Sequence, residues 1–530
     1  MLLSHIGAVD DVLVGAVLIA AALVVATCYI RRARDGQLCK ACDEASSTNP
    51  DVTRTQRLLA EGILIHPTKG TYANFTDLAH ALATLCDLPL GDGASKVRPE
   101  EAEKLVHEIG RHKKHVIFCL CDGMGVSTLE AHLPKSAFLR RHNHPDRLVA
   151  VFPSTTPAAL TTLATGAWPG QHGAPGWDLR DQMGCEYPGE PVRDAKEAPS
   201  GPVQIRVLHK APTDMRTGAH LYEMGFDAET IYAATPWANP RESSRRMFFV
   251  NAYNRTEFPI WYRGDMGPAP TMDECAADIG CSAAETVVGH IDEINAAELG
   301  TRACVEHAVD EYGKACDQVL QHATKWDRAG ERTYSYIYTA HPDKHMHALG
   351  AEHACVGDVV RGLNEKLEAL VTSLQRAGLD AALVISADHG HVTVQPEHMV
   401  VLNWEQLCCL EYANIGVHGK GRHAVFHCRS GRHAEFERAW RRDTRLVTSF
   451  VLLTVEEASD LGLFGPDPPK RHVRPRLGDF LAISLGKDTL CTPTEHAKWA
   501  CTGKCQGAHG SLARDEMRIP FVLATTSAAE

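Results

Sequence analysis

The chain has 530 residues, which is enough for one large domain or two ordinary ones. Its hydrophobic content of 44% and charged content of 23% are those of a globular protein and exclude a largely disordered one. The formal net charge of −12 argues against non-specific nucleic-acid binding, which needs a basic surface. We therefore expect no stable nucleic-acid partner.

An uncharged apolar run of 19 residues, Val12 to Ile30, lies near the N-terminus. That length is just enough to span a bilayer as a helix, and the acidic residues before it are unlike the basic start of a cleaved signal peptide. We expect one transmembrane helix within residues 1–35, the alternative being a buried Ala/Val-rich helix. The positive-inside rule favours a cytoplasmic location for the rest of the chain, because three arginines follow the run, Arg31, Arg32 and Arg34.

Residues 36–112 are predicted to form a polar tether and then a helical region, with a helix from Asp77 to about Asp87. The first strong strand is His115 to Cys121, a short apolar run typical of a strand buried on both faces. Its two cysteines, Cys119 and Cys121, are interpreted as free thiols in the core.

Later apolar runs repeat this pattern and predict further strands at Leu148 to Phe152, Tyr334 to Tyr338, Ala381 to Ile385, Phe480 to Leu485 and Phe521 to Ala524. Helical patterns separate them, the clearest running from His353 to Ala377 with apolar residues three and four apart. Strands that alternate with helices of this length predict an α/β fold with a mostly parallel central sheet flanked by helices.

The stretch from about 177 to 330 is richer in Pro, Gly and Arg and lacks comparable buried strands. We interpret it as a cap inserted into a main domain of residues 113–530, where it would select substrates. Its helical segment from Ala297 to His322 is expected to return to the main core.

Seven oxygen and nitrogen donors stand directly after predicted strands or in a late Gly-rich loop. Ligands of parallel sheets bind beyond the carboxyl ends of the strands, so these donors are expected to converge. Three Asp, three His and one hydroxyl suit a pair of divalent ions of the zinc type, with manganese also compatible. The predicted metal ligands are Asp122, Thr156, Asp343, His347, Asp388, His389 and His509.

Three of these donors have a local reason for their place. Thr156 opens a predicted helix from Pro157 to Thr165, where its hydroxyl meets the positive end of the helix dipole, although such a threonine is also a common cap. Asp343 and His347 are four residues apart and share one face if that segment is helical, which turns the competing ligand His345 elsewhere.

These residues carry a resemblance to the type I phosphodiesterase/nucleotide pyrophosphatase family of the alkaline phosphatase superfamily. Its nucleophile segment is similar to Phe152-Pro153-Ser154-Thr155-Thr156, Leu160-Thr161, Thr165-Gly166, Pro169 and His172-Gly173. The other motifs follow in the family's order as Asp122-Gly123, Asp343-x-x-x-His347, Asp388-His389-Gly390 and His509-Gly510. The resemblance covers about residues 113–526.

The resemblance implies an alkaline phosphatase-like fold with two zinc ions at the site. One ion would be held by Asp343, His347 and His509, and the other by Asp122, Asp388, His389 and Thr156. It also implies that Thr156 attacks phosphorus in line, giving a phosphothreonyl intermediate that water hydrolyses. Ala159 stands where the resemblance implies a phosphate-binding asparagine, which leaves the preference for diesters over monoesters open.

We therefore expect a metal-dependent phosphodiesterase or nucleotide pyrophosphatase that acts on a small phosphoester or nucleotide. A phosphomonoesterase or phosphonate hydrolase on the same metal core is the alternative within enzymes. A membrane-tethered binding protein without activity is disfavoured, because its expected signature is the loss of a ligand and all seven are present.

Overall fold

The computed structural model describes residues 49–88, 99–183, 201–206, 213–214, 243–251, 299–411, 416–419, 421–471, 473–502 and 506–528. All of them belong to one compact unit, Asn49–Glu530. The predicted transmembrane helix at 12–30 lies outside these ranges and stays a prediction. Within the described ranges, every helix is too short or too polar to cross a bilayer.

A five-stranded sheet forms the centre of this unit, in the order β19-β9-β2-β8-β7. Its middle strands are β2 (His115–Cys121), β8 (Thr333–Thr339) and β9 (Ala381–Ser386), which pair in parallel and are buried along their whole length. β7 (Arg246–Asn251) extends the parallel side, and β19 (Val522–Thr525) pairs antiparallel with β9. The predicted α/β fold is therefore confirmed, and both core cysteines of β2 are free thiols.

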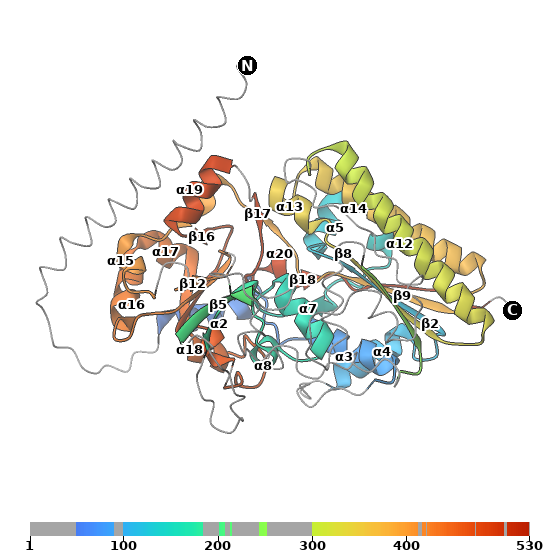
Figure 1. The fold of residues 1–530 in the computed structure, drawn as a ribbon, viewed down its shortest axis with the longest axis horizontal. Coiled ribbons are helices and arrows are strands. Elements are labelled where there is room, and N and C mark those ends of the chain that lie inside the picture. Colours follow the sequence, from blue (N-terminus) through green and yellow to red (C-terminus); the bar gives the residue numbers. More distant parts are fainter. Residues whose placement is uncertain are drawn as a thin grey trace, which may run out of the picture. The chain divides into compact units, whose positions relative to one another are not determined.

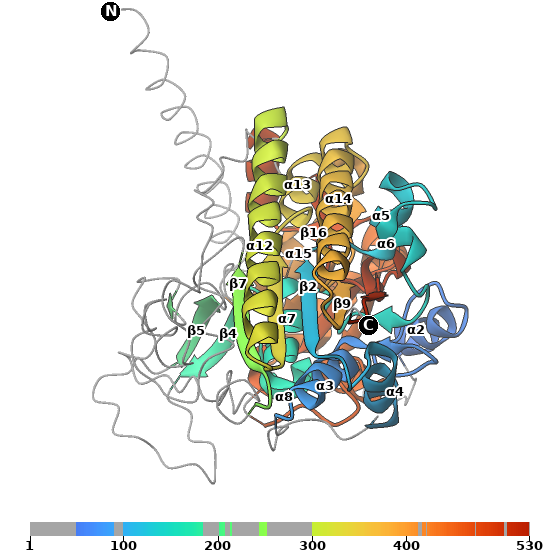
Figure 2. The same ribbon diagram turned by 90° about the vertical axis from the view of Figure 1, so that its right-hand side faces the viewer.

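Helices cover both faces of this sheet. On one face α12 (Arg302–Arg328) and α14 (Ala354–Arg376) lie side by side, and α7 (Thr156–Thr165) lies on the other, where it packs on α3 (Phe75–Leu85) (Figures 1 and 2). α14 forms as predicted, because its apolar side chains recur on one stripe and are all buried: Val356, Val360, Leu363, Leu367, Leu370 and Leu374.

Much of the predicted cap, 177–330, lies outside the described residues. Three of its strands form a small antiparallel sheet in the order β4-β5-β6, namely β4 (Asp178–Met183), β5 (Gly201–Arg206) and β6 (Thr213–Asp214). Two other parts of the same segment, β7 and α12, belong to the central sheet and its helical layer. The segment is therefore not a cap throughout.

The sequence did not predict a second, antiparallel sheet, whose strand order is β12-β13-β15-β14. Its strands are β12 (Val417–His418), β13 (His423–Phe426), β15 (Phe480–Ser484) and β14 (Phe450–Thr454). Successive side chains of a strand point to opposite faces, so β14 contributes to two cores. Phe450 and Leu452 pack in a local core with α16 (His433–Arg442), and Val451 and Leu453 pack in the main core. The sheet is thus buried on both faces.

The predicted strand Leu148 to Phe152 is wrong as a member of the central sheet. Only β3 (Leu148–Val149) forms, in a separate sheet with β1 (Ala73–Asn74) and β18 (Arg518–Ile519). The rest of the run is buried without strand pairing and leads directly into α7. An apolar run indicates that a segment is buried. It does not indicate which sheet the segment joins, because that depends on a partner strand elsewhere in the chain.

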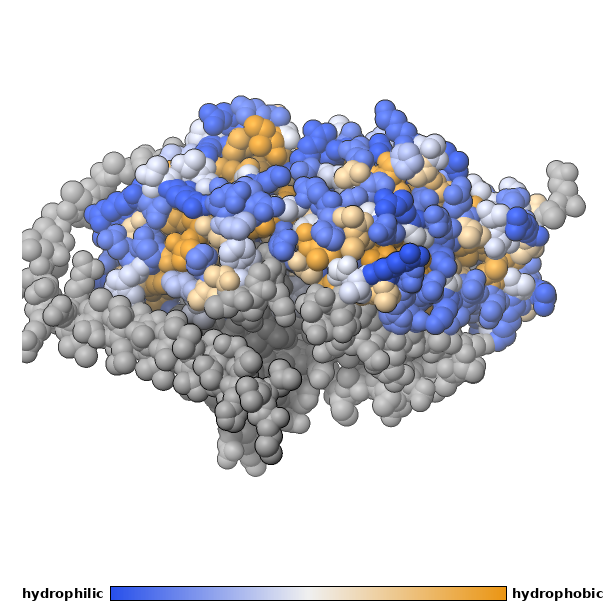
Figure 3. All heavy atoms as spheres, turned by 90° about the horizontal axis from the view of Figure 1, so that it is seen from above, coloured by the Kyte–Doolittle hydropathy of each residue, from blue (hydrophilic) through white to orange (hydrophobic). Residues whose placement is uncertain are grey.

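The remaining described elements are short, and hydrophilic residues separate small hydrophobic patches on the face seen in Figure 3. Among the described residues, Ile63 is the exposed large hydrophobic residue, with 48% of its surface accessible to solvent. These elements include α2 (Pro50–Ala60), α4 (Pro99–Ile109), α5 (Val126–His132), α6 (Phe138–Arg141), α8 (Pro169–His172), α13 (Asp343–Leu349), β10 (Val392–Thr393), β11 (Met399–Val401), α15 (Trp404–Leu407), α17 (Thr444–Ser449), α18 (Val455–Asp460), β16 (Thr489–Cys491), α19 (Pro493–Thr502), β17 (Gly507–Ala508) and α20 (Arg514–Met517).

Candidate metal centre

Three neighbouring strands of the central sheet deliver acidic residues to the same edge. Asp122 directly follows β2, Asp343 opens the helix after β8, and Asp388 comes two residues after β9. Because β2 lies between β8 and β9 and all three are parallel, their carboxyl ends meet. The predicted convergence of these three carboxylates is observed.

Main-chain contacts hold these strand ends together. The Asp343 N–H donates to the Asp122 carbonyl at 3.1 Å, and the Gly123 N–H donates to Asp388 Oδ1 at 3.0 Å. Gly123 has a φ of 72°, and a Cβ there would lie 2.8 Å from the Cβ of Asp343. Only glycine allows this approach.

Asp343, His347, His391 and His509 form what we call the first cluster, whose ligand atoms all lie within 4.8 Å of one another. Asp343 Oδ2 is 3.4 Å from His347 Nε2, and Asp343 Oδ1 is 3.3 Å from His391 Nε2. His347 Nε2 and His509 Nε2 are 3.2 Å apart. α13 puts Asp343 and His347 one turn apart, as predicted.

Asp122, Asp388 and His389 form the second cluster. His389 Nε2 lies 3.4 Å from Asp122 Oδ1 and 3.4 Å from Asp388 Oδ2. Thr156 Oγ1 lies 3.2 Å from the same Nε2. The Tyr338 hydroxyl donates to Asp122 Oδ2 and so orients that carboxylate.

The two clusters adjoin. The rings of His389 and His509 stack with centroids 3.6 Å apart and an interplanar angle of 9°. All seven predicted donors are therefore brought to one place, although Thr156 arrives on α7 from a loop and not from a strand of the central sheet.

Thr156 is the first residue of α7, one position earlier than predicted, with Thr155 as the N-cap and Pro157 second. Its side chain is buried, with 2% of the residue exposed. The first backbone N–H groups of a helix have no partner within the helix and carry partial positive charge. The Thr156 hydroxyl therefore lies at a helix end that favours an anion.

Buried polar atoms at the site lack hydrogen-bond partners within the described part of the chain. Burial, with the charges of Asp388 and Asp343, raises the pKa of Asp122 well above its usual range. Such carboxylates are costly to bury without a compensating cation, and oxygen and imidazole donors suit zinc or manganese. The clusters therefore fit a pair of divalent ions. The atoms without a hydrogen-bond partner are Asp122 Oδ1, Asp343 Oδ1, Asp388 Oδ2 and His391 Nε2.

Backbone carbonyls orient the histidine rings so that Nε2 faces the clusters. The Nδ1 atom of His347 is 2.9 Å from the Gly507 carbonyl, and that of His509 is 2.8 Å from the Ser154 carbonyl. His389 Nδ1 contacts the carbonyl of Gly390 at 2.9 Å. A hydrogen on Nδ1 leaves the Nε2 lone pair for a metal, which is the usual arrangement of metal-binding histidines.

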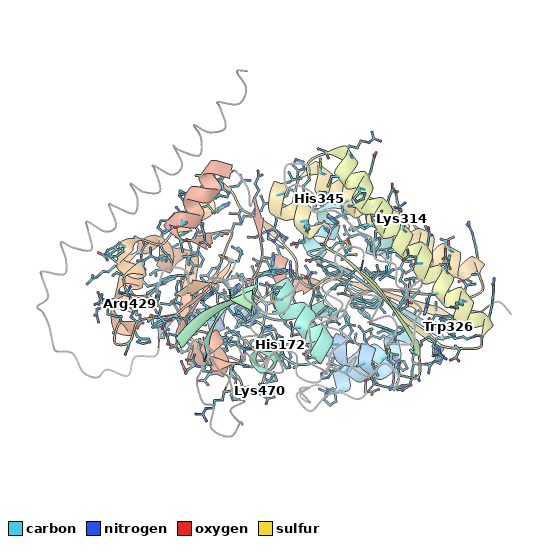
Figure 4. The ribbon with its side chains drawn as sticks, in the orientation of Figure 1. His172, Lys314, Trp326, His345, Arg429 and Lys470 are labelled. Carbon is cyan, nitrogen blue, oxygen red and sulfur yellow. The ribbon has the colours of Figure 1, made fainter. Side chains whose placement is uncertain are left out.

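His391 was not predicted from the sequence, although the run Asp388-His389-Gly390-His391 contains a second histidine that could have been noticed. His345, the competing ligand on α13 (Figure 4), contacts residues outside both clusters, as expected. Its Nδ1 lies 2.9 Å from His341 Nδ1, and its Nε2 lies 3.8 Å from the Cys304 thiol.

Ala159 is fully buried in the main hydrophobic core. That environment accounts for an alanine without reference to the substrate. The inference drawn from it about diesters and monoesters stays untested.

Comparison with known proteins identifies the family. The family described as type I phosphodiesterase / nucleotide pyrophosphatase matches residues 116–512, which is more than half of the chain. The chain belongs to this family. Type I phosphodiesterases/nucleotide pyrophosphatases are phosphoester hydrolases, so the coarse prediction of a hydrolase of this class is confirmed.

Solved structures of low sequence identity are similar to this chain. Murine ectonucleotide pyrophosphatase/phosphodiesterase 5 is 16% identical with a TM-score of 0.47, and the match covers 79% of this chain and 89% of that one. Phosphonoacetate hydrolase from Sinorhizobium meliloti 1021, in complex with phosphonoacetate, is 17% identical with a TM-score of 0.46, covering 78% and 90%. A search of curated proteins found no match.

Proposed function

We propose that this chain is a two-metal phosphoric ester hydrolase that uses Thr156 as its nucleophile and acts on phosphodiesters or pyrophosphates. The observation that carries the proposal is the position of Thr156 Oγ1, buried at the start of α7 and 3.2 Å from His389 Nε2. The family match over residues 116–512 supports the same reaction class.

The residues that would hold the two ions follow from the clusters. The first ion would be held by Asp343, His347 and His509, and the second by Asp122, Asp388, His389 and the Thr156 hydroxyl. When bound, divalent cations of this kind lower the proton affinity of a nearby hydroxyl and neutralise charge on phosphate oxygens. Zinc is the proposed metal, with manganese compatible.

Thr156 would then attack phosphorus in line with the departing oxygen. A bond forms between Thr156 Oγ1, which loses its proton, and phosphorus while the bond to the leaving oxygen breaks. The leaving oxygen takes up a proton, and the resulting phosphothreonyl intermediate keeps the ester substituent that did not depart. Water cleaves the new bond in a second step and restores the hydroxyl. The N-terminal end of α7 favours the phosphate at this point, because its free N–H groups carry partial positive charge.

A comparison of three substrates tests the reaction class. We expect the full-length chain to hydrolyse bis-p-nitrophenyl phosphate and a nucleotide phosphodiester at least tenfold faster, in kcat/KM, than p-nitrophenyl phosphate. Faster cleavage of the monoester would replace the proposal with a phosphomonoesterase on the same metal core. Cleavage of a phosphonate alone, measured by release of inorganic phosphate, would replace it with a phosphonate hydrolase.

The N-terminal apolar run, Val12 to Ile30, supports a single membrane anchor with the hydrolase on the cytoplasmic side. In sealed inside-out vesicles, added protease is expected to digest the unit from residue 49 onward, and in right-side-out vesicles the unit is expected to survive. The reverse pattern would overturn the orientation. Recovery in the soluble fraction would overturn the anchor itself.

A further inference from the structure

We propose that His391 is a fourth protein ligand of the ion that Asp343, His347 and His509 would hold. The first cluster would then be a site of three histidines and one aspartate. This inference rests on the proposed function, because it presupposes that ion. It goes beyond the seven donors that the family resemblance implies.

Strand pairing places His391 beside a residue already assigned to the site. β10 begins directly after His391, and β17 ends directly before His509. The two strands pair antiparallel with Val392 opposite Ala508, so the next opposing pair is His391 and His509. Their ring centroids are 5.3 Å apart.

The ring of His391 is oriented as a ligand's would be. Its side chain is completely buried, and its Nε2 lies 3.3 Å from Asp343 Oδ1. Its Nδ1 faces the Val392 carbonyl at 3.4 Å, which leaves the Nε2 lone pair directed at the cluster. Within the described residues this buried Nε2 has no hydrogen-bond partner.

Gly507 makes room for this ring. A Cβ at that position would lie 2.6 Å from Cε1 and 2.9 Å from Nδ1 of His391. The carbonyl of the same glycine orients the ring of His347. Gly507 therefore helps to position two of the three histidines around Asp343, namely His347 and His391.

A fourth protein ligand has a measurable consequence. Zinc prefers four tetrahedral ligands, and a site that supplies all four holds its ion more firmly than one that leaves a position open. The two ions of this chain should therefore differ in affinity, with the tighter one in the first cluster. The alternative role for His391 is to hydrogen-bond Asp343 and orient it without touching the ion.

Zinc titration tests whether His391 contributes to holding the ion, and the structure of the zinc-loaded chain separates the two roles. The full-length chain, freed of metal with a chelator, is titrated with zinc against a chromophoric competitor. We expect wild type to bind two ions, and His391→Leu to bind one of them about 100-fold more weakly or worse. His345→Gln serves as the matched control, because His345 is buried on α13 beside the cluster but contacts His341 and Cys304. Its two zinc affinities should stay within threefold of wild type.

A crystal structure of the zinc-loaded chain, with anomalous data at the zinc edge, gives the direct answer. We expect His391 Nε2 at about 2.0–2.1 Å from the ion in the first cluster. A separation beyond about 3 Å, with Nε2 bonded to Asp343, would make His391 a positioning residue and overturn the proposal. His391→Gln, compared by thermal melting, guards against a folding defect in the leucine variant.

The outcomes also separate this inference from the proposed function. Wild type that binds no divalent ion would refute both. Wild type that binds two ions, with unchanged zinc affinity in folded His391→Leu, would refute the fourth ligand alone. Asp343→Asn should weaken one ion in either case, and so reports on the cluster independently of His391.

Discussion

Thr156→Ala is expected to lower kcat by about 10⁴-fold or more on every phosphoester that the wild type cleaves. The reason is that the variant lacks the only atom that forms the new bond to phosphorus, while the clusters and the helix end stay in place. Steady-state hydrolysis of bis-p-nitrophenyl phosphate measures this loss. Acid quenching during turnover of this diester should trap a p-nitrophenyl phosphoryl group on the peptide that contains Thr156 in wild type and not in the variant.

Thr161→Val is the matched control for this change. Thr161 is a buried threonine of the same helix, and its Oγ1 has no hydrogen-bond partner within the described residues. Valine has the same shape and removes only a hydroxyl that makes no hydrogen bond among the described residues, so kcat should stay within about threefold of wild type. Unimpaired turnover by folded Thr156→Ala would refute Thr156 as the nucleophile, and a phosphoryl group trapped on another residue would identify the correct one.

Metal removal is expected to abolish turnover and to lower the melting temperature, with zinc restoring both. Three carboxylates meet at the site, and a cation present at 100 to 1,000 times its Kd would stabilise the folded chain by about 3–4 kcal/mol. Calorimetric melting with and without chelator measures the stability. Elemental analysis should give two ions per chain for wild type.

Asp388→Asn is expected to remove the ion of the second cluster and to leave the other ion bound. Asp388 is completely buried, and its Oδ1 accepts from the N–H groups of Gly123 and His389. An asparagine keeps that acceptor but replaces the charged Oδ2, so metal content should fall to one ion and activity should be lost. Asp380→Asn, just before the opposite end of β9, removes an ion pair with Lys113 and should leave both ions bound. Two ions in Asp388→Asn would contradict the second cluster.

The strands that were predicted correctly are those whose burial is uniform. β2, β8 and β9 are buried along their whole length, so β2 and β9 are almost continuous apolar runs and β8 is rich in tyrosine, and each stops where the polar edge begins. That stop also locates Asp122 and Asp388, and helical spacing then pairs Asp343 with His347. Local periodicity was sufficient for these four residues.

The errors came where pairing over long distances decides. Leu148 to Phe152 has the same apolar character as β2, but only its first two residues pair, and they pair with β1 and β18. The sheet of β12 to β15 was missed because β15 pairs with β13 and β14, and helices separate β15 from both of them in the sequence. The pattern of apolar and polar residues in one strand does not indicate which distant strand forms backbone hydrogen bonds with it.

The sequence by itself determined the donors: which residue types are present, in what order, and at which strand ends they stand. The family resemblance implied how those donors divide into two sets. Only the tertiary structure decided that the two sets adjoin, because stacking of His389 on His509 and pairing of β10 with β17 are contacts between distant segments. The same pairing added His391 to Asp343, His347 and His509. Metal binding requires donor atoms at short distances from one another. In this chain those distances depend on the sheet, which brings the carboxyl ends of its parallel strands together.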